Sequence, residues 1–304
     1  MRITVVGAGA MGQLVGARLA LAGEDVVLLD TDERVRDTLS ARGVTLHTEV
    51  GTEHTPVTAS RAEDVHGPVD LVVVFTKGFH TRAAVDSVGH LIGPDTLGLT
   101  LQNGLGHADV LADAFGADRT IAGVTDFPAD LVETGRVHTA TRGSVRIGGV
   151  GEGDGAAHVA EVLNRARLNA SVVDDVRVPV WEKVAFNAAL NTVSAITGAT
   201  VGGMGASVQA RRIVEAVMDE VAAVAAAEGV GFSLDRVRAA VGNAFAHHGD
   251  HKSSMLIDRE AGRRTEVDFI GGAVVERGRA AGIPTPVLAT LCDLVRMLTE
   301  PGGH

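Results

Sequence analysis

Short apolar runs alternate with helical patterns along the first half of the chain. Four runs are rich in Val, Ile and Leu, as in strands buried in a sheet, and they lie at residues 3–6, 26–29, 71–75 and 97–101. Apolar residues recur at helical spacing between them, over residues 11–22, 32–41 and 81–91. This alternation predicts a parallel sheet covered by helices on both faces.

The pattern changes after residue 120. Polar alternation and turn residues over 120–147 predict antiparallel strands that extend the sheet, and a helix at 156–168 with a strand near 171–173 completes the domain. Beyond residue 175 nearly all patterns are helical, over 180–196, 208–228, 234–246, 265–281 and 287–298. The predicted fold class is therefore α/β, with an α/β domain over residues 1–175 and an all-α domain over residues 176–304.

A glycine-rich hexapeptide joins the first predicted strand to the first helix, and it consists of Gly7, Ala8, Gly9, Ala10, Met11 and Gly12. In this context G-x-G-x-x-G is typical of a Rossmann-type dinucleotide-binding domain. Gly7 permits a tight turn, Gly9 lets a pyrophosphate approach the backbone, and Gly12 lets helix and strand pack closely. The helix N-terminus then offers N–H groups to the diphosphate. The alternative is a glycine-rich turn without a ligand.

Asp30 ends the second predicted strand at the spacing of a carboxylate that binds the adenosine ribose. Such a carboxylate repels a 2′-phosphate, which favours NAD over NADP. Two alternatives stay open, because Asp30 could cap the following helix, and Arg34 or Arg36 could turn toward a phosphate.

Lys183, Asn187 and Asn191 recur every four residues on an otherwise apolar helix. The solvated faces of the other helices carry Glu and Arg instead, so this line indicates the wall of a cleft. A lysine partly shielded from water can have its pKa lowered and donate the proton that ketone reduction needs, while amides orient a carboxylate or hydroxyl. The alternative is an ordinary exposed stripe.

Two further segments carry candidate chemistry. Glu266 lies in the first turn predicted for the helix over 265–281, where complementing the helix dipole is the alternative role. Residues 101–106 follow a predicted parallel strand, at the end where open α/β sheets bind ligands, and a plain turn is the alternative.

Composition narrows the classes of function. The 304 residues include 38 acidic and 27 basic ones, a formal net charge of −11, which favours neither nucleic acid nor an anionic membrane as partner. The single cysteine, Cys292, excludes an internal disulfide and a Cys-rich metal site, and we expect no metal, because His247, His248 and His251 are typical of a polar loop. No long apolar run or secretory signal occurs, so we expect a cytoplasmic protein. The apolar helices of the second half are compatible with a core or with a homodimer interface.

Together these motifs resemble the ketopantoate reductases (2-dehydropantoate 2-reductases). The resemblance covers essentially the whole chain, and the order and spacing of the motifs are specific. They are Gly7–Gly12, Thr76–Lys77, Gln102–Gly106, Trp181–Lys183 with Asn187 and Asn191, Ser253–Leu256, and Arg264–Asp268.

The resemblance implies a Rossmann domain joined to a helical domain, with the active site between them. It implies that Lys183 is the general acid, that Lys77 contacts the cofactor, and that Glu266 lies by the cofactor and the substrate hydroxyl. Asn103 is implied on the nicotinamide side and at the substrate. The residues implied to bind a small 2-oxo acid are Asn103, Asn187, Asn191 and Ser254.

Three positions depart from the family pattern. Members that use NADP often carry Arg just after the second strand, and two Asn-containing dipeptides are expected near the catalytic helix. This chain has instead Asp30-Thr31, Asn191-Thr192 and Val201-Gly202. The first departure argues against NADP, and the other two argue against ketopantoate itself.

The predicted function is NAD(P)H-dependent reduction of a small 2-oxo acid, most simply 2-dehydropantoate to (R)-pantoate in pantothenate biosynthesis, with hydride from the nicotinamide and a proton from Lys183. An NAD-dependent D-2-hydroxyacid dehydrogenase, like the D-mandelate dehydrogenases of the family, is the alternative enzyme. A dinucleotide sensor without turnover is the alternative from another class. A sensor needs only the first domain's motif, so the residues of the helical domain argue against it.

Overall fold

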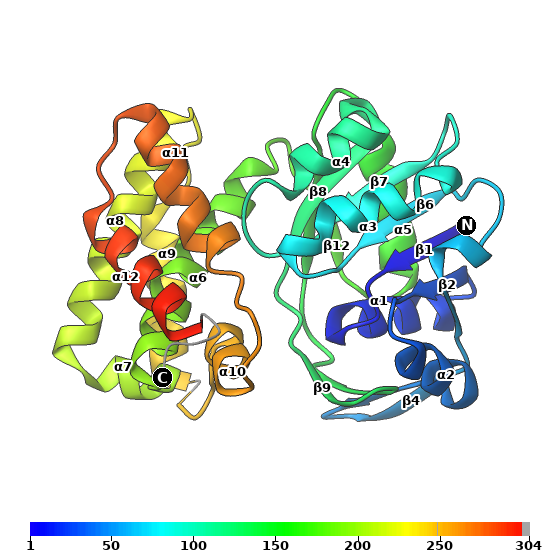
Figure 1. The fold of residues 1–304 in the computed structure, drawn as a ribbon, viewed down its shortest axis with the longest axis horizontal. Coiled ribbons are helices and arrows are strands. Elements are labelled where there is room, and N and C mark those ends of the chain that lie inside the picture. Colours follow the sequence, from blue (N-terminus) through cyan, green and yellow to red (C-terminus); the bar gives the residue numbers. More distant parts are fainter. Residues whose placement is uncertain (248, 300–304) are drawn as a thin grey trace. The chain divides into compact units, whose positions relative to one another are not determined.

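The computed structural model describes residues 1–247 and 249–299, which form two compact units (Figure 1). Unit 1 comprises residues 1–102 and 107–176, and unit 2 comprises residues 103–106 with the described residues from 177 onward. The predicted fold class is confirmed, because unit 1 contains all the strands of the described ranges and unit 2 is helical. No helix in these ranges combines the length and apolar character that crossing a bilayer would demand.

Unit 1 is built on an eight-stranded sheet. Its strands are β1 (Arg2–Val6), β2 (Asp25–Leu29), β5 (Thr58–Ser60), β6 (Leu71–Val74), β7 (Leu97–Thr100), β8 (Thr120–Thr125), β11 (Val145–Gly149) and β12 (Ala170–Val172). They lie in the order β12-β11-β8-β7-β6-β1-β2-β5. The strands from β8 to β5 run parallel, and β11 pairs antiparallel with β8.

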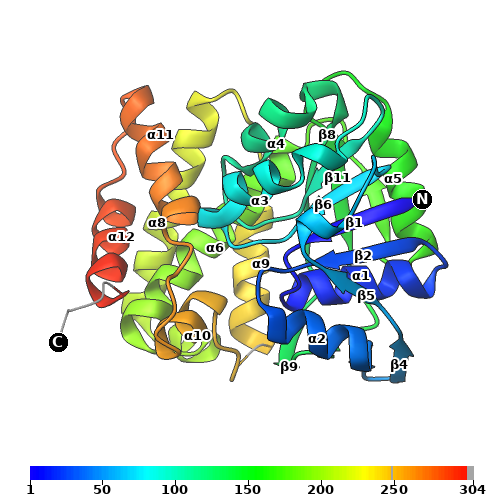
Figure 2. The same cartoon turned by 45° about the vertical axis from the view of Figure 1, so that its right-hand side comes forward.

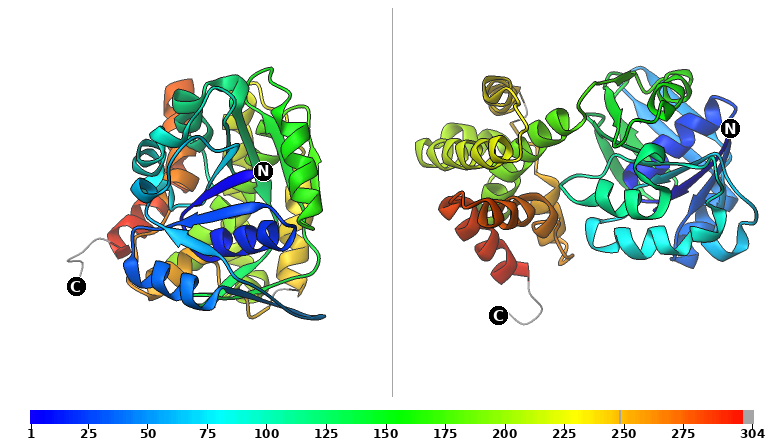
Figure 3. Two further views of the ribbon diagram at one scale, coloured as in Figure 1. Left: turned by 90° about the vertical axis from the view of Figure 1, so that its right-hand side faces the viewer. Right: turned by 90° about the horizontal axis from the view of Figure 1, so that it is seen from above.

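Helices cover both faces of this sheet. The helices of unit 1 are α1 (Ala10–Leu21), α2 (Glu33–Arg42), α3 (Thr81–Ser87), α4 (His107–Phe115) and α5 (Gly155–Arg165). On β6, Leu71 and Val73 pack with the core that α1 and α5 share, whereas Val72 and Val74 pack with the core under α3 and α4 (Figures 2 and 3). All four side chains are buried, which explains the continuous apolar run.

A second sheet of four strands corrects one prediction. Its strands are β3 (Val44–Thr48), β4 (Gly51–Thr55), β9 (Ala129–Glu133) and β10 (Arg136–Thr139), in the order β4-β3-β10-β9. Residues 120–147 were predicted to extend the main sheet, and for β9 and β10 this is wrong, because β10 pairs with β3. Polar alternation identifies a strand but not a partner that is distant in sequence, and the contact with α1 helps to select the partner here.

Unit 2 is organised around one long helix. Its helices are α6 (Arg177–Thr197), α7 (Val201–Ala206), α8 (Val208–Ala227), α9 (Leu234–His247), α10 (Ser254–Glu260), α11 (Ala273–Ala281) and α12 (Pro286–Thr299). Helix α6 packs against α8, α9, α10 and α12, and most of its side chains are buried. The helix predicted over 265–281 starts with a π-helical turn, Asp268–Gly272, in which the Gly272 N–H donates to the Val267 carbonyl at 2.8 Å.

Burial makes the single cysteine inert. Cys292 is fully buried on α12, and burial raises the pKa of its thiol to about 12. At pH 8 the thiol is therefore almost entirely protonated, whereas the thiolate is the reactive form. We expect Ellman's reagent to label Cys292 at pH 8 only after unfolding in guanidinium. Complete labelling of the native protein at the rate of the unfolded chain would contradict this.

Candidate active site

The glycine motif contains two glycines that the fold requires and one that it does not. Gly7 has a φ of +99°, and a Cβ there would lie 2.9 Å from the backbone nitrogen of Thr76. A Cβ on Gly12 would overlap the carbonyl oxygen of Gly7. A Cβ on Gly9, by contrast, would meet no described atom within 4 Å beyond its chain neighbours. Packing within the described residues therefore does not account for Gly9, whereas a pyrophosphate against its backbone does.

The N-terminus of α1 also fits a diphosphate. Gly9 is the N-cap, no described side chain hydrogen-bonds there as a cap, and the first turn carries no acidic residue. Ala10 and Met11 begin the helix, so their N–H groups are among those that an α-helix leaves without an internal acceptor. These donors and the helix dipole together favour an anion. Unit 1 thus fits the dinucleotide that the motif predicts.

Asp30 is held by two backbone N–H groups. Its carboxylate accepts from Ala8 at 3.0 Å and from Asp32 at 2.9 Å, so it braces the glycine motif. Asp32, not Asp30, caps α2, by accepting from the Arg34 N–H at 2.9 Å. The Arg36 guanidinium donates to the carbonyl oxygen of Asp30 at 2.9 Å. The Ala8 N–H therefore already has an acceptor within the protein. Asp30 lies at the end of β2, where the ribose of a dinucleotide is expected.

Lys77 follows β6 and caps a 3₁₀ turn, Gly78–His80. The preceding residue, Thr76, contacts Gly7 of the glycine motif. Lys77 therefore leaves the sheet beside the motif, at the carboxyl end of the parallel strands where open α/β sheets bind ligands.

The polar line on α6 runs into the interior of unit 2. Lys183 and Asn187 are half-buried, and Asn191 is only 7% exposed. The side chains between them belong to the core of the unit. An ordinary solvated stripe would be exposed along its length, so the burial supports the interpretation as a cleft wall.

The segment after β7, Asn103–Gly106, belongs to unit 2 although its neighbours in the chain belong to unit 1. The Leu105 N–H donates to the Phe269 carbonyl at 2.8 Å, and its side chain packs in the core of unit 2. Gly104 has a φ of +104°, and a Cβ there would overlap the Phe269 carbonyl oxygen. Only glycine therefore permits this approach, which places Asn103 in the unit that carries the helical residues.

Glu266 and Ser254 each lie at or just before the start of a helical element of unit 2. Glu266 comes just before the π-helical turn, and its carbonyl oxygen accepts from Phe269 and Ile270, both at 3.1 Å. Ser254 begins α10 and is exposed, whereas the buried Ser253 caps that helix. Both α10 and the π-helical turn contact α6. Unit 2 thus contains all the predicted catalytic and substrate-binding residues, namely Asn103, Lys183, Asn187, Asn191, Ser254 and Glu266.

The two departures from the family pattern in this unit are core positions. Thr192 is fully buried, and its hydroxyl donates to the Ala188 carbonyl of its own helix at 2.7 Å. Val201 is 4% exposed in the core cluster. Neither side chain therefore supplies the polar contact that an amide at these positions would supply.

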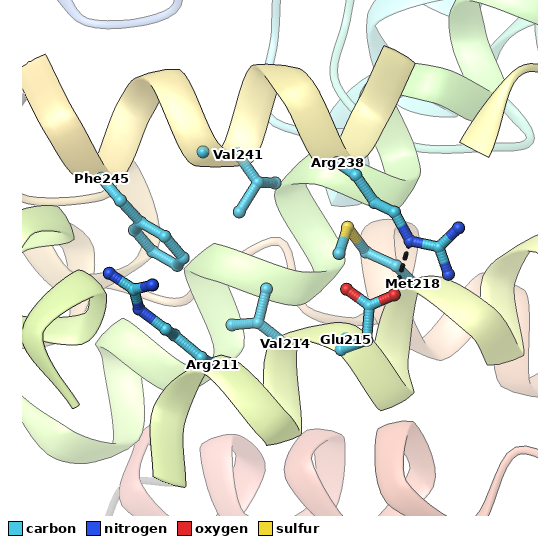
Figure 4. Close-up of a pocket in the computed structure, with 8 residues that line it drawn as sticks. Arg211, Val214, Glu215, Met218, Arg238, Val241 and Phe245 are labelled. Atoms are coloured by element: carbon cyan, nitrogen blue, oxygen red, sulfur yellow. Dashed lines mark hydrogen bonds and ion pairs between the residues drawn. The ribbon is translucent and has the colours of Figure 1, made fainter. Parts of the chain in front are cut away.

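A hollow of about 160 Å³ between α8 and α9 lies apart from these residues (Figure 4). Within it Arg238 pairs with Glu215 at 2.5 Å, and Arg211 lies over the ring of Phe245. None of the predicted site residues lines it, so it is not the candidate active site. Across the described ranges no three His, Cys, Asp or Glu side chains are grouped as metal ligands, and His248 lies outside those ranges.

One residue that sequence reasoning missed is Gln13. Its side chain is fully buried, and it donates to the Ala8 carbonyl at 2.6 Å and accepts from the Gly135 N–H at 2.8 Å. The available signal was an amide inside an apolar helical pattern directly after the glycine motif. Gln13 holds the motif in place from within the fold.

A unit that fits a dinucleotide and a helical unit that contains candidate acid–base residues are typical of a two-unit class of oxidoreductase. The sequence matches the family described as "Ketopantoate reductase PanE/ApbA" over residues 3–152 and the C-terminal part of that family over residues 175–299. It is 35% identical to the 2-dehydropantoate 2-reductase of Halobacterium salinarum, over 99% of this chain and 100% of the relative. It is 30% identical to that of Streptococcus pyogenes serotype M6, over 97% of each.

Solved structures agree with this assignment. A D-mandelate dehydrogenase with NADH and anilino(oxo)acetate has a TM-score of 0.93 at 29% identity, over 98% of each chain. The 2-dehydropantoate 2-reductase of Geobacter metallireducens has a TM-score of 0.90 at 32% identity, over 97% of this chain and 99% of the other. The chain belongs to the ketopantoate reductase family, and the prediction of an NAD(P)-dependent oxidoreductase is confirmed.

Proposed function

We propose that this protein reduces a small 2-oxo acid to the 2-hydroxy acid with NADH, and that the substrate is 2-dehydropantoate and the product (R)-pantoate. The observation that carries the proposal is the buried end of the polar line on α6, in the unit that also contains Asn103 and Glu266. The relatives named 2-dehydropantoate 2-reductase support the choice of substrate.

The residues of unit 2 have separate tasks in this reaction. The nicotinamide, when bound, supplies the hydride. Lys183 donates a proton to the ketone oxygen as negative charge develops on it. Asn187, Asn191 and Ser254 orient the carboxylate and side chain of the acid without adding charge, and Glu266 accepts a hydrogen bond from the substrate hydroxyl. On unit 1, the glycine motif binds the pyrophosphate, and Asp30 and Lys77 contact the cofactor.

A second candidate is an NAD-dependent D-2-hydroxyacid dehydrogenase with a less polar substrate. The buried Val201 and the internally bonded Thr192 favour it, because two expected polar contacts are replaced by core positions. The structural similarity to a D-mandelate dehydrogenase supports it as well.

One experiment separates these functions. Initial rates of NADH and NADPH oxidation are measured with 2-dehydropantoate, phenylglyoxylate and short aliphatic 2-oxo acids. The highest kcat/KM with 2-dehydropantoate supports the proposal, and the highest with phenylglyoxylate supports the second candidate. Binding of NADH without oxidation by any 2-oxo acid would indicate a sensor instead.

We expect NADH to be preferred to NADPH, because the Asp30 carboxylate repels a 2′-phosphate. Asp30→Asn removes the charge but keeps an oxygen that can accept from the Ala8 N–H. It should therefore lower the ratio of kcat/KM with NADH to kcat/KM with NADPH by about tenfold, or about 1.4 kcal/mol. Asp30→Ala is the control, because it also loses the brace and should weaken both cofactors. A wild-type kcat/KM with NADPH equal to that with NADH would refute the preference.

A further inference from the structure

A polar network ties together the carboxyl ends of β6 and β7 in unit 1. At its centre the side-chain amide of Gln102 donates to the Thr76 carbonyl at 2.7 Å and to the Thr81 hydroxyl at 2.8 Å. Its side-chain oxygen accepts from the Thr100 hydroxyl at 2.9 Å. Both N–H groups and the oxygen of the amide thus have partners within unit 1, in the segment after β6, at the start of α3 and at the end of β7.

The partners allow only this orientation of the amide. The Thr76 carbonyl can only accept, so the NH₂ group must face it. Thr81 and Thr100 are 2% and 4% exposed, and the Thr81 hydroxyl lies 3.3 Å from Nδ1 of the buried His107. Thr76 and Gln102 are half-buried, and hydrogen bonds from both ends of the Gln102 amide hold the segment after β6, the start of α3 and the end of β7 together.

The order of the strands shows which half of a dinucleotide this network faces. In the sheet, β2 lies on one side of β1, and β6 and β7 lie on the other. With the pyrophosphate at the N-terminus of α1 and the adenosine at Asp30 on β2, the nicotinamide half extends over the ends of β6 and β7. The loops there carry Lys77 and lead into Asn103.

Resting on the proposed function, we propose that Gln102 is a positioning residue for the nicotinamide half of the cofactor. It fixes the loop that carries Lys77 to the strand end that precedes Asn103. Gln102 acts through these neighbours, because both N–H groups and the oxygen of its amide already have partners within unit 1.

Gln13 provides a matched contrast in the same unit. Its side-chain amide also donates through the nitrogen and accepts through the oxygen, but it donates to the Ala8 carbonyl of the glycine motif. Loss of the Gln13 brace should affect the pyrophosphate, which ADP-ribose and NADH share. Loss of the Gln102 brace should affect only the nicotinamide half.

The test compares Gln102→Met and Gln13→Met in titrations with ADP-ribose and NADH, followed by kinetics. Because each neutral hydrogen bond has a modest net value, Gln102→Met should raise the Kd for NADH about tenfold and leave the Kd for ADP-ribose within about twofold. It should also lower kcat, because the nicotinamide is misplaced. Gln13→Met should raise both dissociation constants by the same factor.

Two variants of Thr81 keep the inference testable if Gln102→Met does not fold. Thr81→Val removes the acceptor for Gln102 in a nearly isosteric side chain, whereas Thr81→Ser keeps it. Thr81→Val should reproduce the selective loss of NADH affinity, and Thr81→Ser should restore wild-type values.

Equal effects on ADP-ribose and NADH, or an unchanged Kd for NADH, would overturn the role of Gln102. Wild-type protein that binds NADH but reduces no 2-oxo acid would overturn the proposed function instead, and the binding comparison would still decide the positioning role.

Discussion

Lys183→Met is expected to lower kcat by about 10²- to 10⁴-fold, the usual loss for a positioned general acid, which corresponds to about 2.7–5.5 kcal/mol of barrier. The Kd for NADH should stay within about twofold, because Lys183 lies on α6 in unit 2 and the glycine motif lies in unit 1. Steady-state rates with the preferred 2-oxo acid and fluorescence titration with NADH measure the two effects. Methionine is unbranched like lysine and only one atom shorter, so packing on α6 changes little.

Asn191→Ala is the control for this variant. It removes a proposed neutral contact with the substrate, so its effect should appear mainly in KM. The kcat of the wild type should also fall at high pH, because a general acid must be protonated to act. If Lys183→Met keeps more than about a tenth of wild-type kcat, Lys183 is not the proton donor. Glu266→Gln would then test whether a protonated Glu266 takes that role.

Gly9→Val is expected to abolish dinucleotide binding while both units stay folded. The backbone at Gly9, with a φ of −72°, is accessible to any residue, and a Cβ there meets no described atom within 4 Å beyond its chain neighbours. The added methyl groups would instead occupy the space where the pyrophosphate approaches. Loss of the NADH fluorescence enhancement at an unchanged melting temperature is the expected result.

Gly12→Ala is the matched variant with the opposite profile. Its Cβ would overlap the Gly7 carbonyl, so unit 1 should lose stability whether or not a ligand is present. Retained NADH binding by Gly9→Val would contradict the assignment of the glycine motif to a pyrophosphate.

Features set by neighbouring residues could be predicted from the sequence. The strands β1 and β6 follow from short continuous apolar runs, because nearly all their side chains are buried, and the helix α6 follows from apolar residues at helical spacing. The glycine motif and the line from Lys183 to Asn191 have the same local origin. The resemblance to a family added the roles that spacing alone leaves open.

Features set by distant partners could not be predicted in this way. Whether β10 extends the main sheet or pairs with β3 depends on which surface is available to it after folding. The assignment of Asn103 to unit 2 depends on the contact between Gly104 and Phe269. Short helices such as α7 and α10 contain too few turns to show a period.

The sequence by itself determined the two kinds of fold, the order of the main elements and the residue types available for hydride transfer. Only the tertiary structure decided how those residues are held, with Asp30 bonded to Ala8 and Gln102 bonded to three threonines of neighbouring elements. Periodicity reports whether a side chain is buried, since burial recurs along one element. A hydrogen bond between elements depends on the distance and direction of two groups far apart in the chain, and these exist only once the chain is folded.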